Sequence, residues 1–180
     1  MKSISVIRFT SLFLAGAMLA SATESGDRNY QAAGSKLLKE VQFTAGQLNT
    51  EAGTLDSYAR GGISRASHGY QLTVIKDRIN ALGERLAMLQ AIRDDAAPWQ
   101  QAAIDSMMPV AVKLAAHTEA AILHFNESDK PLWHPDYTGH LRAISDHSGE
   151  VKDIVDLHLD MASTGNKLDR LRERAASYNN

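Results

Sequence analysis

Cysteine is absent from the 180-residue sequence, and proline, aromatic residues and long apolar runs are scarce. Without cysteine the chain cannot hold a disulfide framework, a thiolate-bound metal, a covalently attached c-type haem or a lipid on an N-terminal cysteine. The four prolines are few, and helix-forming residues such as Ala, Leu, Glu and Lys are plentiful. We therefore expect an all-α protein that is stabilised by its core rather than by covalent cross-links.

The first 22 residues have the features of a cleaved signal peptide. Lys2 and Arg8 give a positively charged start, and the following run FTSLFLAGAMLA is apolar but too short to span a bilayer. Ala20 and Ala22 put small side chains at the two positions that a signal peptidase reads, so we expect cleavage after Ala22. A retained membrane anchor is the alternative. The prediction is a signal peptide at 1–22 and an exported domain at 23–180, in the periplasm or outside the cell.

The later sequence has neither a membrane span nor a basic cluster. No segment after the signal peptide approaches about 18 consecutive apolar residues, so no membrane contact is expected once the signal peptide is removed. Removal of residues 1–22 leaves 17 of the 19 basic side chains against 21 acidic ones, and the basic residues are spread along the chain. We therefore expect no nucleic-acid partner.

Apolar residues recur at alternating spacings of three and four in the first half of the chain, as in a coiled-coil seam. The first such seam contains Leu38, Val41, Ala45, Leu48, Ala52, Leu55 and Ala59. The second contains Leu72, Ile75, Ile79, Leu82, Leu86 and Leu89. Ser25 or Asp27 is the expected cap of the first helix, Gly61 and Gly62 end it, and Ser64 or Ser67 caps the second.

Two further helices are predicted in the second half, over 98–126 and from about Pro135 onward. Pro109 lies inside the third, where a proline predicts a kink or a division into two shorter helices. The predicted apolar stripe of the fourth helix contains Tyr137, Leu141, Ile144, Val151, Ile154, Val155, Met161 and Leu168. The final charged run, KLDRLRERAA, is expected to be a solvated last turn or two. Trp99 and Trp133 are expected to close the ends of the core, with an exposed binding surface at Trp133 as the alternative.

Four long helices with short connections predict an antiparallel, up-down-up-down four-helix bundle. In this topology the Gly61–Gly62 turn and the 126–135 loop share one end. Six of the seven histidines then lie in the half of the bundle next to that end, and only His158 lies nearer the middle. The histidines that such a topology gathers include His68, His117, His124, His140 and His147.

These histidines allow two interpretations. Imidazole is a good ligand for copper, zinc or nickel, so the cluster could form a metal site between facing helices. However, His117 and His124 are two helical turns apart, about 10 Å, and cannot bind one ion together. No His-x-x-x-His or Glu-x-x-His motif is present. The preferred interpretation is half-buried rings that bond to carbonyls, carboxylates or water, with no metal ligand and no resident cofactor.

Three runs carry a resemblance to known sequences: APWQQAAID, AAHTEAAILHFNES and DYTGHLRAISD. They resemble parts of uncharacterised secreted helical proteins of soil bacteria, best over residues 97–146. The resemblance implies the fold and the export route, and no activity.

No catalytic motif is found either. Ser148 stands beside His147, but no Gly-x-Ser-x-Gly turn surrounds it. We therefore expect a non-enzymatic interaction or structural module of the cell envelope, with a protein partner or a second copy of the chain as its binding partner. The alternative is a periplasmic metal-binding protein that uses the histidines at one end of the bundle.

Overall fold

A computed structural model describes residues 24–127 and 131–178, with side chains described from Asn29 onward. These residues form four α-helices and one short 3-10 turn, and no strand occurs among them. The prediction of an all-α, four-helix protein is confirmed. The predicted signal peptide and its cleavage site lie outside the described residues. None of the helices that the structure describes is long and apolar enough to cross a membrane.

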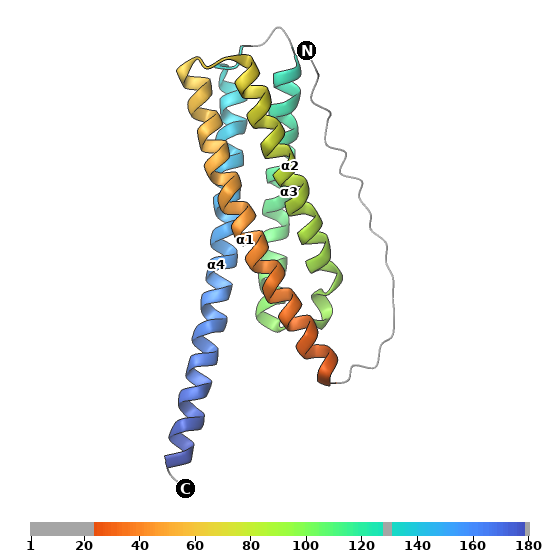
Figure 1. The fold of residues 1–180 in the computed structure, drawn as a ribbon, viewed down its shortest axis with the longest axis vertical. Coiled ribbons are helices and arrows are strands. Elements are labelled where there is room, and N and C mark those ends of the chain that lie inside the picture. The colour runs from red at the N-terminus through yellow and green to blue at the C-terminus, as the bar shows by residue number, and fades with distance from the viewer. Residues whose placement is uncertain (1–23, 128–130, 179–180) are drawn as a thin grey trace.

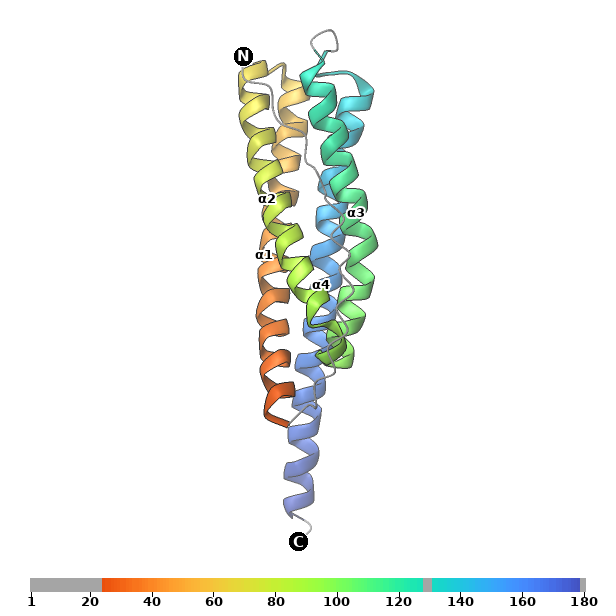
Figure 2. The same ribbon diagram turned by 90° about the vertical axis from the view of Figure 1, so that its right-hand side faces the viewer.

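The helices are α1 (Glu24–Gly61), α2 (Arg65–Ala91), α3 (Pro98–Asn126) and α4 (Pro135–Tyr178), with the 3-10 turn η1 (Arg93–Asp95) between α2 and α3. They lie side by side along one long axis (Figure 1). Helix α1 packs against α2 and α4, and α3 packs against α4 and α2. The view turned by 90° shows the α1–α2 and α3–α4 connections at one end, here called the upper end (Figure 2).

The helix ends follow local chemistry. Gly62 has a φ of 66°, a left-handed conformation that glycine adopts without strain, and it stops α1. The Ser64 hydroxyl then accepts the Ser67 backbone N–H at 3.3 Å and caps α2, as predicted. Helix α1 begins at Glu24, so its predicted caps Ser25 and Asp27 lie inside the helix instead.

Helix α3 is tied to α1 at its start by one buried glutamine. The Gln100 side chain accepts the Ala97 N–H at 3.0 Å and donates to the Gln31 carbonyl at 2.8 Å and to the Ser35 hydroxyl at 3.0 Å. Further along, α3 continues through Pro109 as one helix, so of the two expected outcomes, a kink or a division into two shorter helices, the division is wrong. Pro109 and Asp105 are both exposed, and water can satisfy the carbonyl that the proline leaves free.

The seams predicted for α1 and α2 are buried along their whole length. Every one of their thirteen residues is at most 5% exposed. Helix α3 adds a wider buried stripe that includes Ile104, Met107 and Ile122, and α4 adds Tyr137, Leu141 and Ile144. Because these faces all meet in one cluster, the core runs along the bundle axis.

Two predictions about exposure are wrong. Met161 and Leu168, assigned to the buried stripe of α4, are 58% and 46% exposed. Trp133, expected to close the core, is 70% exposed, whereas Trp99 packs against the core as expected. The charged end of α4 is solvated as predicted, but the exposed stretch is longer than the last two turns, because all of 163–178 is exposed. Helix α4 therefore extends well beyond the other three (Figure 1).

Candidate functional sites

The first histidine cluster lies inside the upper end and is centred on Tyr137. Tyr137 and His68 are both fully buried, and the phenolic oxygen lies 3.2 Å from His68 Nδ1. The His124 ring stacks on Tyr137 with its centroid 5.1 Å away, and His124 Nε2 lies 3.2 Å from the Pro131 carbonyl oxygen. The start of α2, the end of α3 and the start of α4 thus meet around one phenol.

Burial sets the protonation of this cluster. Burial lowers the pKa of His68, and the nearby positive charge of Arg65 lowers it further. A hydrogen bond with the Tyr58 backbone raises this pKa and offsets part of the decrease. Burial also raises the pKa of Tyr137 well above its ordinary range, so the phenol keeps its proton. A protonated phenol can donate to His68 Nδ1, which leaves the imidazole proton on Nε2. His68 Nε2 is buried and has no side-chain hydrogen-bond partner among the described residues.

The second cluster lies on the contact between α3 and α4 and contains His117, His140 and His147. His117 Nδ1 lies 3.1 Å from His140 Nδ1, and the His117 and His147 rings stack with centroids 5.6 Å apart. His147 Nδ1 lies 3.2 Å from Glu150 Oε2 at the solvent edge. Burial first, and then the neighbouring His140 and His147, lower the pKa of His117.

The histidines predicted to lie near one end of the bundle therefore form two separate clusters in the structure. His117 and His124 belong to different clusters, as their spacing of two turns predicts. No group of three or more His, Asp or Glu side chains within 24–127 and 131–178 is arranged to hold a metal ion. Most rings instead meet a hydroxyl, a carbonyl, a carboxylate or each other. His134 accepts the Asp136 N–H at 3.3 Å and so helps to cap α4.

A buried carboxylate lies near the upper end on the α1–α4 contact. Asp56 is only 6% exposed. Its Oδ2 lies 2.9 Å from Arg60 Nη2, and its Oδ1 lies 3.7 Å from Arg142 Nε. Both guanidinium groups are more than half exposed, so solvent screens the attraction. This arrangement is an ion pair that links α1 and α4.

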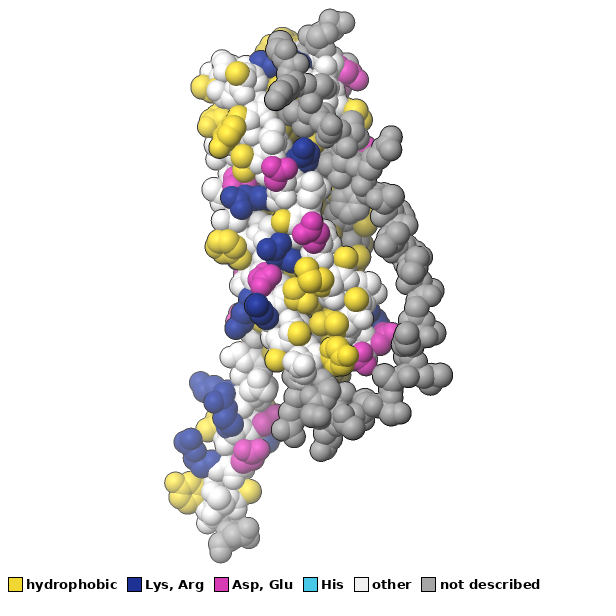
Figure 3. Space-filling view, turned by 45° about the vertical axis from the view of Figure 1, so that its right-hand side comes forward, with side chains coloured by type: hydrophobic (Ala, Val, Ile, Leu, Met, Phe, Trp, Pro, Cys, Tyr) yellow, Lys and Arg dark blue, Asp and Glu magenta, His cyan; other side chains and the backbone are white. Residues whose placement is uncertain are grey.

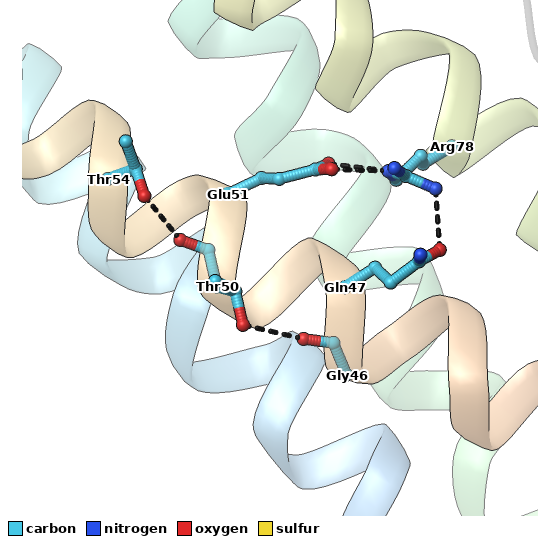
Figure 4. Close-up of polar contacts among 6 residues, drawn as sticks. All are labelled: Gly46, Gln47, Thr50, Glu51, Thr54 and Arg78. Carbon is cyan, nitrogen blue, oxygen red and sulfur yellow. Dashed lines mark hydrogen bonds and ion pairs between the residues drawn. The ribbon is translucent and has the colours of Figure 1, made fainter.

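One of the polar contacts between α1 and α2 is centred on Arg78. Its Nε lies 2.6 Å from both Glu51 carboxylate oxygens, and its Nη1 donates to Gln47 Oε1 at 2.5 Å (Figure 4). Beside this contact a shallow groove of about 450 Å³ runs along α1, lined by Gln47, Glu51 and the exposed Phe43. The Thr50 and Thr54 hydroxyls bond back to their own helix and line no deeper recess.

A second shallow groove, of about 560 Å³, runs between α1 and the outer face of α4. Its lining combines three carboxylates with two apolar side chains, and includes Asn49, Asp146, Gly149, Glu150, Asp153, Ile154 and Leu157. Leu157 is 59% exposed. The groove is therefore acidic and partly apolar, and it lies where α4 runs toward its extension.

Comparison with known proteins adds no relative: no family model, no curated protein and no solved structure matches this chain. The arrangement of residues must therefore carry the functional argument alone. Two of these features are not among the predictions made from the sequence, namely the central position of Tyr137 among the histidines and the exposed apolar stripe of α4. A second series of apolar residues spaced three and four apart could have revealed the stripe.

Stability should fall in mild acid because of the two histidines with lowered pKa values. In the unfolded chain each imidazole has the ordinary value of 6.5, so below that pH the unfolded state binds more protons than the folded state. The free energy of unfolding should be highest above pH 6.5 and decline as the pH falls toward the folded-state pKa values. Urea unfolding from pH 8 to pH 5 would measure this.

The matched variants are His68→Gln and the loop variant His134→Gln. Replacing the fully buried His68 should flatten the decline, and replacing His134, which is 41% exposed, should leave it in place. An unchanged decline in His68→Gln would show that burial of this imidazole does not control acid stability.

Proposed function

We propose that the chain is an exported, non-enzymatic helical-bundle protein that acts as an interaction or structural module of the cell envelope. We also propose antiparallel, up-down-up-down order for its helices. Two contacts support that order. At the start of α2, Arg65 donates to the Phe125 carbonyl at the end of α3. Asn49 Nδ2, in the second half of α1, donates to the Ser145 carbonyl in the first half of α4 at 2.8 Å. The positive start, short apolar run and small residues of 1–22 support export.

One observation carries the interaction role, namely the apolar side chains that α4 leaves in water. Leu157, Met161, Leu168, Leu171 and Tyr178 are each at least 46% exposed. Single exposed apolar residues are ordinary, but a continuous line of them is typical of a binding surface. The interior, in contrast, is filled by the four seams.

Export and independence from metal can be tested on the whole chain expressed in a bacterium with two membranes. Mass spectrometry should find a periplasmic form that begins at Thr23. Ala22→Leu should block processing, and Ser21→Leu, at a position that the peptidase does not read, should not. The processed protein should keep the same unfolding temperature in EDTA. An unprocessed cytoplasmic product, or unfolding in EDTA, would contradict the proposal.

A second candidate function, metal binding, is favoured by one distance. The Nδ1 atoms of His117 and His140 are 3.1 Å apart, and two such nitrogens can share an ion at bond lengths of about 2.0–2.1 Å. Water or a nearby carboxylate would have to complete the coordination. Copper(II), which accepts tetragonal nitrogen and oxygen ligands, suits such an incomplete set better than zinc(II).

Calorimetry on the processed protein would test this pair. If it binds metal, His117→Ala/His140→Ala should abolish copper binding, and His134→Ala should leave it unchanged. A dissociation constant weaker than about 100 μM, or an affinity that the double variant keeps, would rule out the pair as a specific site.

A further inference from the structure

Helix α4 carries a second seam on the flank of its buried face. Its residues, called here the outer seam, alternate in spacing between four and three: Glu150, Ile154, Leu157, Met161, Thr164, Leu168, Leu171, Ala175 and Tyr178. The buried seam of the same helix runs through Val151 and Val155, one position out of phase. Because one residue corresponds to about 100° of rotation, the outer seam lies to one side of the buried face, and from Leu157 onward its large apolar side chains are exposed. Spacing of this kind is the signature of a helix that pairs with another helix.

Among the described residues, none packs over the end of this helix. Every residue from 163 to 178 is exposed, and its side-chain contacts there are local, such as Arg172 Nη1 to Asp169 Oδ1 at 3.1 Å. A helical stretch of about 16 residues without tertiary contacts is only marginally stable in water, and Gly165 weakens it further. A partner helix that packs along this stretch would supply the missing tertiary contacts and stabilise the helix.

The charges beside the outer seam indicate which helix fits. Five charged residues at intervals of seven flank the seam, with acid first and base last: Asp146, Asp153, Asp160, Lys167 and Arg174. In a parallel pair of identical helices, Lys167 would lie near Arg172 of the other copy, which repels. In an antiparallel pair the acidic half of each helix meets the basic half of the other.

The same antiparallel register also pairs the apolar residues. With the two-fold axis between positions 162 and 163, Leu168 lies opposite Leu157 of the second copy, and Leu171 lies opposite its Ile154. Asp160 then lies beside Lys167 of the second copy, and Asp153 beside its Arg174. This one register therefore satisfies charge pairing and apolar pairing together.

We propose that two copies of this chain dimerise through antiparallel pairing of α4, so that each 163–178 extension lies along the outer seam of the other copy. This inference rests on the proposed interaction role and names the partner. The acidic groove lined by Asp153, Ile154 and Leu157 is where the Leu171 and Arg174 side chains of the second copy are placed. Figure 3 shows basic and apolar side chains side by side on the extension, as this contact requires.

Reversing the charges of the residues beside the outer seam tests the dimer directly. The chain without residues 1–22, which keeps every described helix whole, should sediment as a dimer that dissociates on dilution. The Lys167→Asp/Arg174→Asp variant makes all four flanking residues that pair across the dimer acidic, and Asp153→Lys/Asp160→Lys makes all four basic. Each variant alone should associate about tenfold or more weakly, and an equimolar mixture of the two should form a heterodimer.

Register can be tested with added cysteines, because the chain has none of its own. Met161→Cys mixed with Thr164→Cys should form a disulfide-linked pair under mild oxidation, whereas Tyr70→Cys, exposed on α2, should not. All of these substitutions are at exposed positions, and circular dichroism should show folded helices throughout.

Three outcomes would overturn the proposal: a wild type that stays monomeric at all concentrations, charge variants that dimerise as well as wild type, or a mixture that does not associate. A monomer that binds anionic vesicles through 163–178 would show that the extension is a membrane-surface helix instead. If the protein is processed and folded but monomeric, the proposed dimer is wrong and the proposed export stands. If processing fails, the proposed export is wrong and the proposed dimer is unaffected.

Discussion

Leu72→Ala should lower the free energy of unfolding by about 2–5 kcal/mol, among the largest effects expected for a single substitution in this chain. Leu72 is fully buried in the α2 seam and belongs to the continuous core. Removing three carbon atoms there loses their transfer free energy and leaves a cavity that long, packed helices cannot close completely. Urea unfolding followed by circular dichroism would measure the change.

Leu168→Ala is the matched control, because the chemistry is identical and only the environment differs. Leu168 is 46% exposed on the extension, so in the monomer its truncation should change stability by no more than about 0.5 kcal/mol. The measurement must be made at concentrations where no dimer forms. A cost equal to that of Leu72→Ala would mean that the extension packs on its own bundle, and the proposed pairing of α4 would then lose its free surface.

The α1 and α2 seams could be predicted from the sequence because burial along a helix depends mainly on a local rule. An apolar side chain every three or four residues defines one face, and any packed neighbour buries that face. The boundaries at Gly62 and Ser64 were also predictable, since a left-handed glycine and a serine cap act within a few residues. Such features require no knowledge of the rest of the fold.

The outer seam of α4 could not be separated from the buried one by the same rule. Periodicity identifies an apolar face but not what covers it. Met161 and Leu168 fit a stripe that begins at Ile154, which lies on the edge between the two faces. Only the ends of α1 and α3 determine where the bundle stops covering α4, and those ends depend on the packing of all four helices.

The positions of the histidines could likewise be predicted only in part. Helix order predicts the height of each ring along the bundle, and it correctly separates His117 from His124. It cannot predict which ring points toward which neighbour, because that depends on the rotation of each helix about its axis. The pairing of His140 with His117 is one example. The predicted stripe of α4 includes Tyr137 as one more core residue, but it does not predict that the hydroxyl lies 3.2 Å from His68 Nδ1.

Tyr137→Ala should be as damaging as the core truncation, with a loss of about 3–5 kcal/mol, because the ring fills the upper end between His68 and His124. Tyr137→Phe is the informative variant. It keeps the ring and removes only the oxygen 3.2 Å from His68 Nδ1. Since His68 Nε2 has no side-chain hydrogen-bond partner among the described residues, the imidazole would lose its remaining side-chain hydrogen bond, at a cost of about 1–3 kcal/mol. Urea unfolding at pH 8, where His68 is neutral in both states, would measure both values.

A double-mutant cycle shows whether that cost comes from the unsatisfied imidazole. Replacing both partners of a buried hydrogen bond by apolar groups of similar shape can be nearly neutral. The double variant His68→Leu/Tyr137→Phe should therefore be more stable than Tyr137→Phe alone, and His68→Leu alone should leave the Tyr137 hydroxyl unsatisfied and be destabilised in turn. Additive losses in the double variant would mean that the two side chains contribute independently, and that the phenol does not hold the imidazole at the upper end of the bundle.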